Sequence, residues 1–167
     1  MKKCLIIPLL VFFIAGCGDN SKELLDQAEK NAKENKIEES ANLYEQLIKE
    51  NPEGDYTAKA CYDLGTIYKN GLHPKLSREI QLSKAIEYYT IAFEKFPESK
   101  ESPQSLFMIG FIQNNELLDY AAATKTYKTF ITKFPNHELA ASANAELNNM
   151  GLTPEQILEK RLAKTNN

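Results

Sequence analysis

The sequence is poor in the residues that most often carry catalysis, metal binding and phosphate recognition. Its 167 residues include no tryptophan, two histidines and three cysteines. Neither His73 nor His137 has a second ligand at metal-binding spacing, which a zinc site would need. The only G-x-G sequence is Gly16-Cys17-Gly18, so a glycine-rich phosphate loop is also missing. We therefore expect no catalytic residues, no metal site and no cofactor, and a protein that is not an enzyme.

The chain also lacks an excess of positive charge. Lysine and arginine number 20 against 23 acidic residues, and only Arg78 and Arg161 are arginine. Nucleic-acid-binding proteins carry a basic surface, and arginine supplies their bidentate phosphate contacts. We therefore expect no nucleic acid among the partners of this protein.

A long hydrophobic run is missing as well. Two lysines are followed by an apolar stretch of 11 residues, 5–15. A membrane-spanning helix needs about 20 such residues. A short apolar run behind a positive start is typical of a signal peptide, which we expect over residues 1–16.

The apolar stretch ends in Ile14-Ala15-Gly16-Cys17, which resembles the lipobox of bacterial lipoproteins. The resemblance implies cleavage before Cys17, acylation of Cys17 and a short polar tether over residues 17–22. Two or more acyl chains anchor a protein stably to a membrane. Gly18 resembles the outer-membrane sorting pattern, which implies a periplasm-facing lipoprotein in a two-membrane bacterium. The alternative is an ordinary secretory signal that carries a cysteine.

Without the signal peptide, the chain would carry 18 basic and 23 acidic residues, since Lys2 and Lys3 are lost. Cys61 would then be the one cysteine beyond the lipidation position. It has no partner for a disulfide, and a lone cysteine usually behaves as a small buried hydrophobe.

Strand patterns are nearly absent, and apolar residues recur at the three- and four-residue spacing of helices. One pattern of residues recurs along these helices, of the form A-x3-Y-x2-A-x4-P. Its copies are Ala85, Tyr89, Ala92 and Pro97; Ala123, Tyr127, Phe130 and Pro135; and, more loosely, Ser40, Tyr44, Leu47 and Pro52. The preceding helices carry Gly65 and Gly110, with Ala28 at the same place in the first copy.

These motifs resemble the tetratricopeptide repeat. The resemblance implies antiparallel helix pairs in which an aromatic ring lies against a small residue and a proline ends each pair. Such pairs bury their apolar faces only by stacking on one another. We therefore expect an all-α fold, an α-solenoid of about three tetratricopeptide-like pairs plus C-terminal closing helices, over residues 23–165.

Two regions depart from the repeat. Residues 70–76 are an insertion that lengthens the loop between the helices of the second pair, and a helix is expected from about Ser77. After the third pair, Asn136 is expected to cap a helix that runs to about residue 149. The sequence Thr153-Pro154-Glu155-Gln156 is a capping box that predicts a last helix to about Leu162, which should close the open end.

Residues 127–143 also resemble the repeats of envelope lipoproteins of the BamD and CpoB types. That resemblance implies docking of other envelope proteins or peptide segments, in outer-membrane or cell-wall assembly. In tetratricopeptide repeats the first helices of the pairs line the binding side. The residues expected there, outside the core positions, are Lys59, Tyr62, Thr66, Lys69, Gln104, Phe107, Phe111 and Asn114, together with Leu25.

We interpret this set as a groove in which Tyr62, Phe107 and Phe111 anchor a partner segment, while Lys59 and Lys69 orient acidic groups. The alternative is that the rings pack against the neighbouring repeat. Three functions remain open: a protein-binding adaptor or scaffold anchored to the membrane, a self-associating lipoprotein, and a small-ligand-binding envelope protein. The sequence leaves the oligomeric state open.

Overall fold

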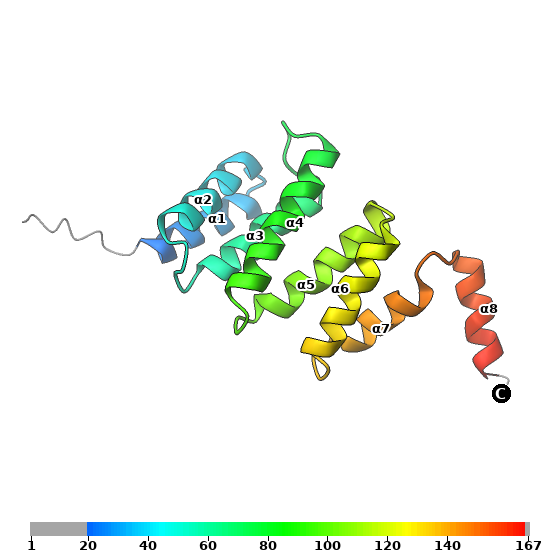
Figure 1. Cartoon of the computed structure of the whole chain (residues 1–167). Coiled ribbons are helices and arrows are strands. Elements are labelled where there is room, and N and C mark those ends of the chain that lie inside the picture. The colour runs from blue at the N-terminus through cyan, green and yellow to red at the C-terminus, as the bar shows by residue number, and fades with distance from the viewer. Residues whose placement is uncertain (1–19, 166–167) are drawn as a thin grey trace, which may run out of the picture.

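The protein is a stack of antiparallel helix pairs (Figure 1). The computed structural model describes residues 20–165, and all regular structure within that range is helical. The helices are α1 (Ser21–Lys33), α2 (Ile37–Glu50), α3 (Thr57–Lys69), α4 (Arg78–Lys95), α5 (Glu101–Phe111) with a π-helical end η1 (Ile112–Glu116), α6 (Tyr120–Lys133), α7 (Ala140–Asn149) and α8 (Pro154–Thr165). The expected all-α solenoid is confirmed. The expected signal peptide and Cys17 lie outside the described residues, and α1 begins at Ser21, within the segment expected as the tether.

Three pairs follow one another along the stack: α1 with α2, α3 with α4, and α5 with α6 (Figure 1). The first helices of the pairs are α1, α3 and α5, and α7 continues their order. The repeated positions on the second helices are all buried, because each faces its own pair and the next. They are Ser40, Tyr44, Leu47, Ala85, Tyr89, Ala92, Ala123, Tyr127 and Phe130.

A glycine on the first helix makes room for a tyrosine of the second helix. A Cβ atom added to Gly65 would lie 2.9 Å from Cε1 of Tyr89, and one added to Gly110 would lie 2.8 Å from Cε1 of Tyr127. Both tyrosines are fully buried. Carbon atoms in contact normally lie about 3.5–4.0 Å apart, so even a methyl group would push the rings away. This close approach of ring and backbone holds the second and third pairs together.

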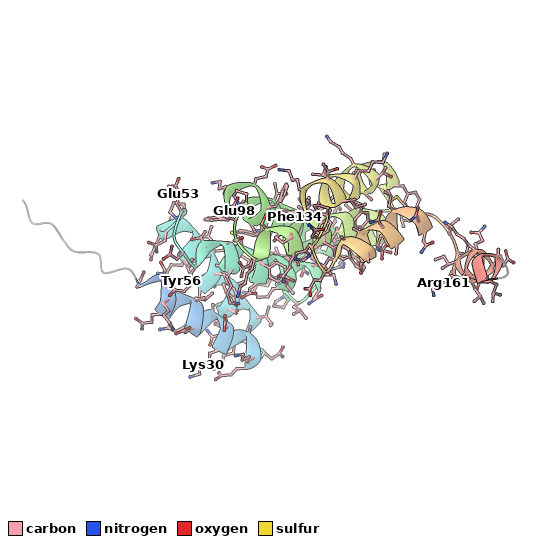
Figure 2. All side chains as sticks on the ribbon, turned by 90° about the horizontal axis from the view of Figure 1, so that it is seen from below. Lys30, Glu53, Tyr56, Glu98, Phe134 and Arg161 are labelled. Atoms are coloured by element: carbon pink, nitrogen blue, oxygen red, sulfur yellow. The ribbon has the colours of Figure 1, made fainter. Side chains whose placement is uncertain are left out.

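The turns between pairs share one backbone geometry. Each second helix ends two residues before a proline, at Glu50, Lys95 and Lys133. Proline cannot donate a helical hydrogen bond, so the helix stops there. Two successive backbone bonds then lead into the next helix, for example from Ser99 N to Phe96 O (3.0 Å) and from Ser102 N to Ser99 O (3.2 Å). Glu53, Glu98 and Phe134, which lie in or beside these turns, follow one another along the stack (Figure 2).

The insertion between α3 and α4 is tied down by a buried glutamine. The side chain of Gln81 accepts a hydrogen bond from His73 N (3.0 Å) and donates to His73 O (3.1 Å) and Leu76 O (2.8 Å). Ser77 caps α4 by accepting from Ile80 N (3.4 Å), so the expected helix start is confirmed. A buried polar side chain that meets several backbone groups defines the path of a loop.

Replacing Gln81 with methionine should therefore loosen the insertion without unfolding the stack. The methionine keeps most of the buried volume, but the backbone groups of the loop lose their partners. We expect a loss of about 1 kcal/mol in the free energy of unfolding. The His73 amide should exchange its hydrogen much faster, as measured by hydrogen exchange with mass spectrometry. Unchanged exchange in this loop would mean that Gln81 does not hold it.

The helix expected from Asn136 begins later, at Ala140. The turn after Pro135 uses the same two backbone bonds as the earlier turns, the second from Ala140 N to His137 O (2.9 Å). In addition, Nδ1 of His137 accepts a hydrogen bond from Leu139 N (3.2 Å). These bonds satisfy the backbone where an Asn136 cap was expected, so the prediction of the helix start was wrong.

The last helix forms as expected but does not close the stack. Its capping box is present: Thr153 N donates to Gln156 Oε1 (2.8 Å), and Gln156 N donates to Thr153 Oγ1 (3.3 Å). However, Leu158 and Leu162 are 58% and 56% exposed, and α8 stands away from the other helices (Figure 1). The facing side of α7 carries small and polar residues, so it offers α8 little apolar surface to bury.

Candidate functional site

The residues expected to face a partner occupy equivalent positions in two repeats. Counted from Gly65 and Gly110, they lie six and three residues before and one and four residues after each glycine. The two sets are Lys59, Tyr62, Thr66 and Lys69 on α3, and Gln104, Phe107, Phe111 and Asn114 on α5 and η1. All except Asn114 are partly exposed. They lie on one side of the row that the first helices α1, α3, α5 and α7 form. We call this side of the row the first-helix face.

Tyr62 and Phe107 are shared between this face and the core. The Tyr62 ring lies 5.6 Å from that of Tyr89, and the Phe107 ring lies 5.7 Å from that of Tyr127, both centroid to centroid. Each ring therefore packs against the second helix of its own pair. Both side chains also remain partly exposed.

The residue directly after the glycine differs between the two repeats, and this changes the hydrogen bonding of the buried tyrosine hydroxyl. Oγ1 of Thr66 lies 2.9 Å from the hydroxyl of Tyr89 and forms a hydrogen bond with it. In the following repeat Phe111 takes the place of Thr66, and the buried hydroxyl of Tyr127 has no hydrogen-bond partner among residues 20–165. Burial, and to a smaller extent the negative charge of Glu146, raises the pKa of Tyr127, so this hydroxyl keeps its proton at neutral pH.

Removing each of the two tyrosine hydroxyls should have a different effect on the stability of the protein. Tyr89→Phe loses a buried hydrogen bond and leaves Thr66 with one partner fewer, so we expect a cost of about 1 kcal/mol. Tyr127→Phe removes a buried hydroxyl that has no partner, so we expect no loss or a small gain in stability. Denaturant unfolding of the two variants measures the difference. Equal losses would show that the Tyr127 hydroxyl does have a partner.

Both lysines of the first-helix face already have contacts. Lys59 Nζ lies 2.9 Å from Glu29 Oε1 and 2.7 Å from Asp63 Oδ2. Burial lowers the pKa of Lys59, but the hydrogen bonds to Asp63 and Glu29 outweigh it and the pKa is raised. Lys69 Nζ lies 5.0 Å from the centre of the Phe111 ring, a cation–π distance. Two carboxylates of the same chain thus already pair with Lys59, whereas Lys69 lies over an aromatic ring.

Two expected face residues are buried instead. Asn114 is 7% exposed, and its Nδ2 donates to Glu146 Oε2 on α7 (2.9 Å). Leu25 is 5% exposed and belongs to the core between the first two pairs. Gln104 is half-buried on α5.

Three contacts link the first helices to one another along the face. Lys59 joins α3 to Glu29 on α1, Lys69 joins α3 to Phe111 on α5, and Asn114 joins η1 to Glu146 on α7. The carboxylates that meet Lys59 and Asn114 were missed from the sequence; they are Glu29, Asp63 and Glu146. A signal was available for two of them, since Asp63 and Glu146 each stand 11 residues after a repeat proline, Pro52 and Pro135.

A pocket of about 600 Å³ opens at the end of this line, between η1, α7 and α8. We call it the Glu146 pocket. Its polar lining includes Asn114, Asn115, Glu146, Asn149 and Arg161, and Tyr120 contributes an aromatic ring. Figure 2 shows Arg161 on α8, at the far end of the stack from Tyr56.

The described residues offer little for catalysis. No cluster of three or more His, Cys, Asp or Glu residues in this part of the chain could hold a metal ion. Nδ1 of His73 accepts from Lys75 N (3.4 Å), as His137 accepts from Leu139 N. Burial raises the pKa of the Cys61 thiol to about 12, which makes the thiolate scarce at neutral pH. Within residues 20–165, no helix combines the length and the apolar character that crossing a membrane requires.

Comparison with known proteins supports the repeat assignment. The family model described as tetratricopeptide repeat matches residues 104–137, from α5 to the turn after α6. A search of curated proteins found no match. The matched pair shares its glycine, its tyrosine and its proline turn with the pair before it. The fold is therefore a tetratricopeptide-like solenoid, an architecture that generally mediates contacts between proteins.

Proposed function

We propose that this protein is a lipid-anchored adaptor that holds other envelope proteins on its first-helix face. The observation that carries the proposal is the row of half-exposed side chains on α3 and α5, presented at equivalent positions by two rigid repeats. Aromatic side chains with buried bases and exposed edges are typical of residues that dominate protein interfaces. Tyr62, Phe107 and Phe111 have this character.

The rigid stack supports a scaffold better than a flexible binder. An ion pair, a cation–π contact and a hydrogen bond join consecutive first helices, so the face keeps its shape before a partner arrives. A preformed face loses less conformational entropy on binding. The role of the repeats is then to present one fixed surface to an extended or helical segment of the partner.

Membrane attachment is the second part of the proposal and rests on the resemblance of residues 14–17 to a lipobox. Cys17 would carry the acyl chains, including palmitate, and hold the repeats at the periplasmic side of the outer membrane. Replacing Cys17 with alanine should move the protein from the membrane to the soluble fraction and abolish incorporation of labelled palmitate. A Cys61→Ala variant is the matched control. Retention of the Cys17→Ala protein in washed membranes would contradict the anchor.

Crosslinking in the native envelope tests the adaptor role. The full lipidated chain is crosslinked in cells, purified through a tag and analysed for the proteins that travel with it. We expect a small set of envelope proteins at reproducible ratios to the protein. Recovery of the protein alone, or only of copies of itself, would contradict the adaptor role.

Self-association is a second candidate, because exposed apolar side chains gather at one end of the stack. Leu118, Leu158 and Leu162 are each more than half exposed there. At the other end, the outer side of α1 is polar. Large exposed apolar patches mark protein contacts. Sedimentation velocity of the full chain in density-matched detergent would give a dimer mass if this candidate holds and a monomer mass if it does not.

A further inference from the structure

We propose that the Glu146 pocket binds a lysine or arginine side chain of the partner segment. This inference rests on the proposed function and adds the chemistry of the partner. It differs from the expectation drawn from the sequence, in which lysines of the face would attract acidic groups.

The first argument is the charge and polarity of the pocket. Glu146 is its carboxylate, and Asn114 and Asn149 add amide oxygens that can accept hydrogen bonds from a cation. Asn114 is buried and donates to one Glu146 oxygen, so the carboxylate is held in one place. The ammonium or guanidinium group of a ligand needs such an arrangement of oxygen acceptors.

The second argument is the buried Tyr127 hydroxyl, which lies beneath the same end of the face. The Tyr127 ring lies against Gly110 on α5 and is fully buried. Its hydroxyl has no hydrogen-bond partner among the described residues. Buried hydroxyl groups are rarely left without a partner unless a ligand or water completes the site. The negative charge of Glu146 acts on this hydroxyl, so an unpartnered oxygen lies near the carboxylate, behind the residues that line the pocket.

The third argument is where the chain's own cations lie. The basic residue that lines the pocket is Arg161, from the loosely packed α8. Its neighbour Lys160 donates from Nζ to the backbone oxygen of Asn148 (2.6 Å) at the C-terminal end of α7. Helix C-termini attract cations, and α7 has no basic residue in its own last turn. The structure thus already directs two positive side chains of α8 to this end of α7.

The test uses the full chain in detergent and three short fluorescent peptides with the same leucine and tyrosine residues. The remaining positions are lysine in the first peptide, glutamine in the second and glutamate in the third. Fluorescence anisotropy should show that the lysine peptide binds most tightly. Glu146→Gln keeps the shape of the side chain and removes its charge, and should weaken that binding roughly tenfold. Glu138→Gln, which changes an exposed carboxylate in the turn before α7, is the matched control and should bind as the unmodified protein does.

A second variant covers the case in which Glu146→Gln destabilises α7. Arg161→Gln removes the cation that α8 brings to the pocket, so the lysine peptide should bind this variant at least as tightly. Weaker binding would overturn the inference.

The other outcomes separate the inference from the proposed function. Equal affinity for the lysine and glutamine peptides would overturn the cation site and leave the protein-binding face intact. Equal weakening by Glu146→Gln and Glu138→Gln would show that only the overall charge of the protein matters, and it would also overturn the cation site. Failure of all three peptides to bind would count against both.

Discussion

Tyr89→Ala should lower the free energy of unfolding by roughly 3–5 kcal/mol, the usual cost of truncating a buried aromatic side chain to alanine. Tyr89 is fully buried against Gly65, contacts the Tyr62 ring and bonds Thr66. Its removal opens a cavity between α3 and α4, because Gly65 has no side chain that could fill the space left by the ring. A loss of this size is a large part of the stability of a small domain.

The measurement is chemical unfolding followed by circular dichroism, with Tyr120→Ala as the matched control. Tyr120 is 42% exposed at the start of α6 and occupies no repeat position. Its truncation should cost less than about 1 kcal/mol. Similar losses for both variants would contradict the view that the ring between paired helices holds the repeat together.

Phe111→Ala should weaken partner binding by roughly 2 kcal/mol, or about thirtyfold, if Phe111 is one of the few residues that dominate the interface. Its ring is half-buried at the centre of the first-helix face, with Lys69 above it. Truncation removes both the apolar anchor and the support that holds the lysine in place. The amount of partner recovered with the purified protein after crosslinking in cells reports the effect.

The stack offers a close control for this variant. Phe93 on α4 is also half-buried beneath a lysine, with Lys133 Nζ 5.5 Å from the ring centre, but it lies on the second helices. Phe93→Ala should cost a similar amount of stability and leave partner recovery unchanged. If both variants reduce recovery equally, the effect comes from stability and not from the face.

The repeat itself could be predicted from the sequence because it depends on local spacing. A small residue, a tyrosine and a proline at fixed intervals determine where helices approach and where they stop. Gly65, Gly110, Tyr89 and Tyr127 are therefore found in the expected contacts. The same locality explains the capping box at Thr153, whose partners are three residues apart.

The candidate site was only partly predictable, because its chemistry depends on pairs that are distant in sequence. Asn114 and Glu146 are 32 residues apart and meet only when α7 packs beside the end of α5. From the sequence alone, Thr66 and Phe111 are two residues of the expected binding side. The consequence of their difference, a Tyr127 hydroxyl without a partner among the described residues, requires the three-dimensional contact.

The position of α8 was mispredicted for a related reason. Its sequence is amphipathic and well capped, so local rules favour the helix. Whether a terminal helix docks depends on the surface that it meets, and α7 presents small and polar residues there, including Ala141 and Asn144. Leu158 and Leu162 consequently remain exposed.

Site-specific photo-crosslinking in cells tests most directly whether the first-helix face is the surface that binds partners. A photoreactive phenylalanine analogue replaces Gln104 on α5 in one strain and the exposed Glu87 on α4 in another. We predict discrete crosslinked products at position 104, which disappear when Phe111→Ala is added, and none at position 87. Products at position 87 with none at position 104 would contradict the assignment of the binding face.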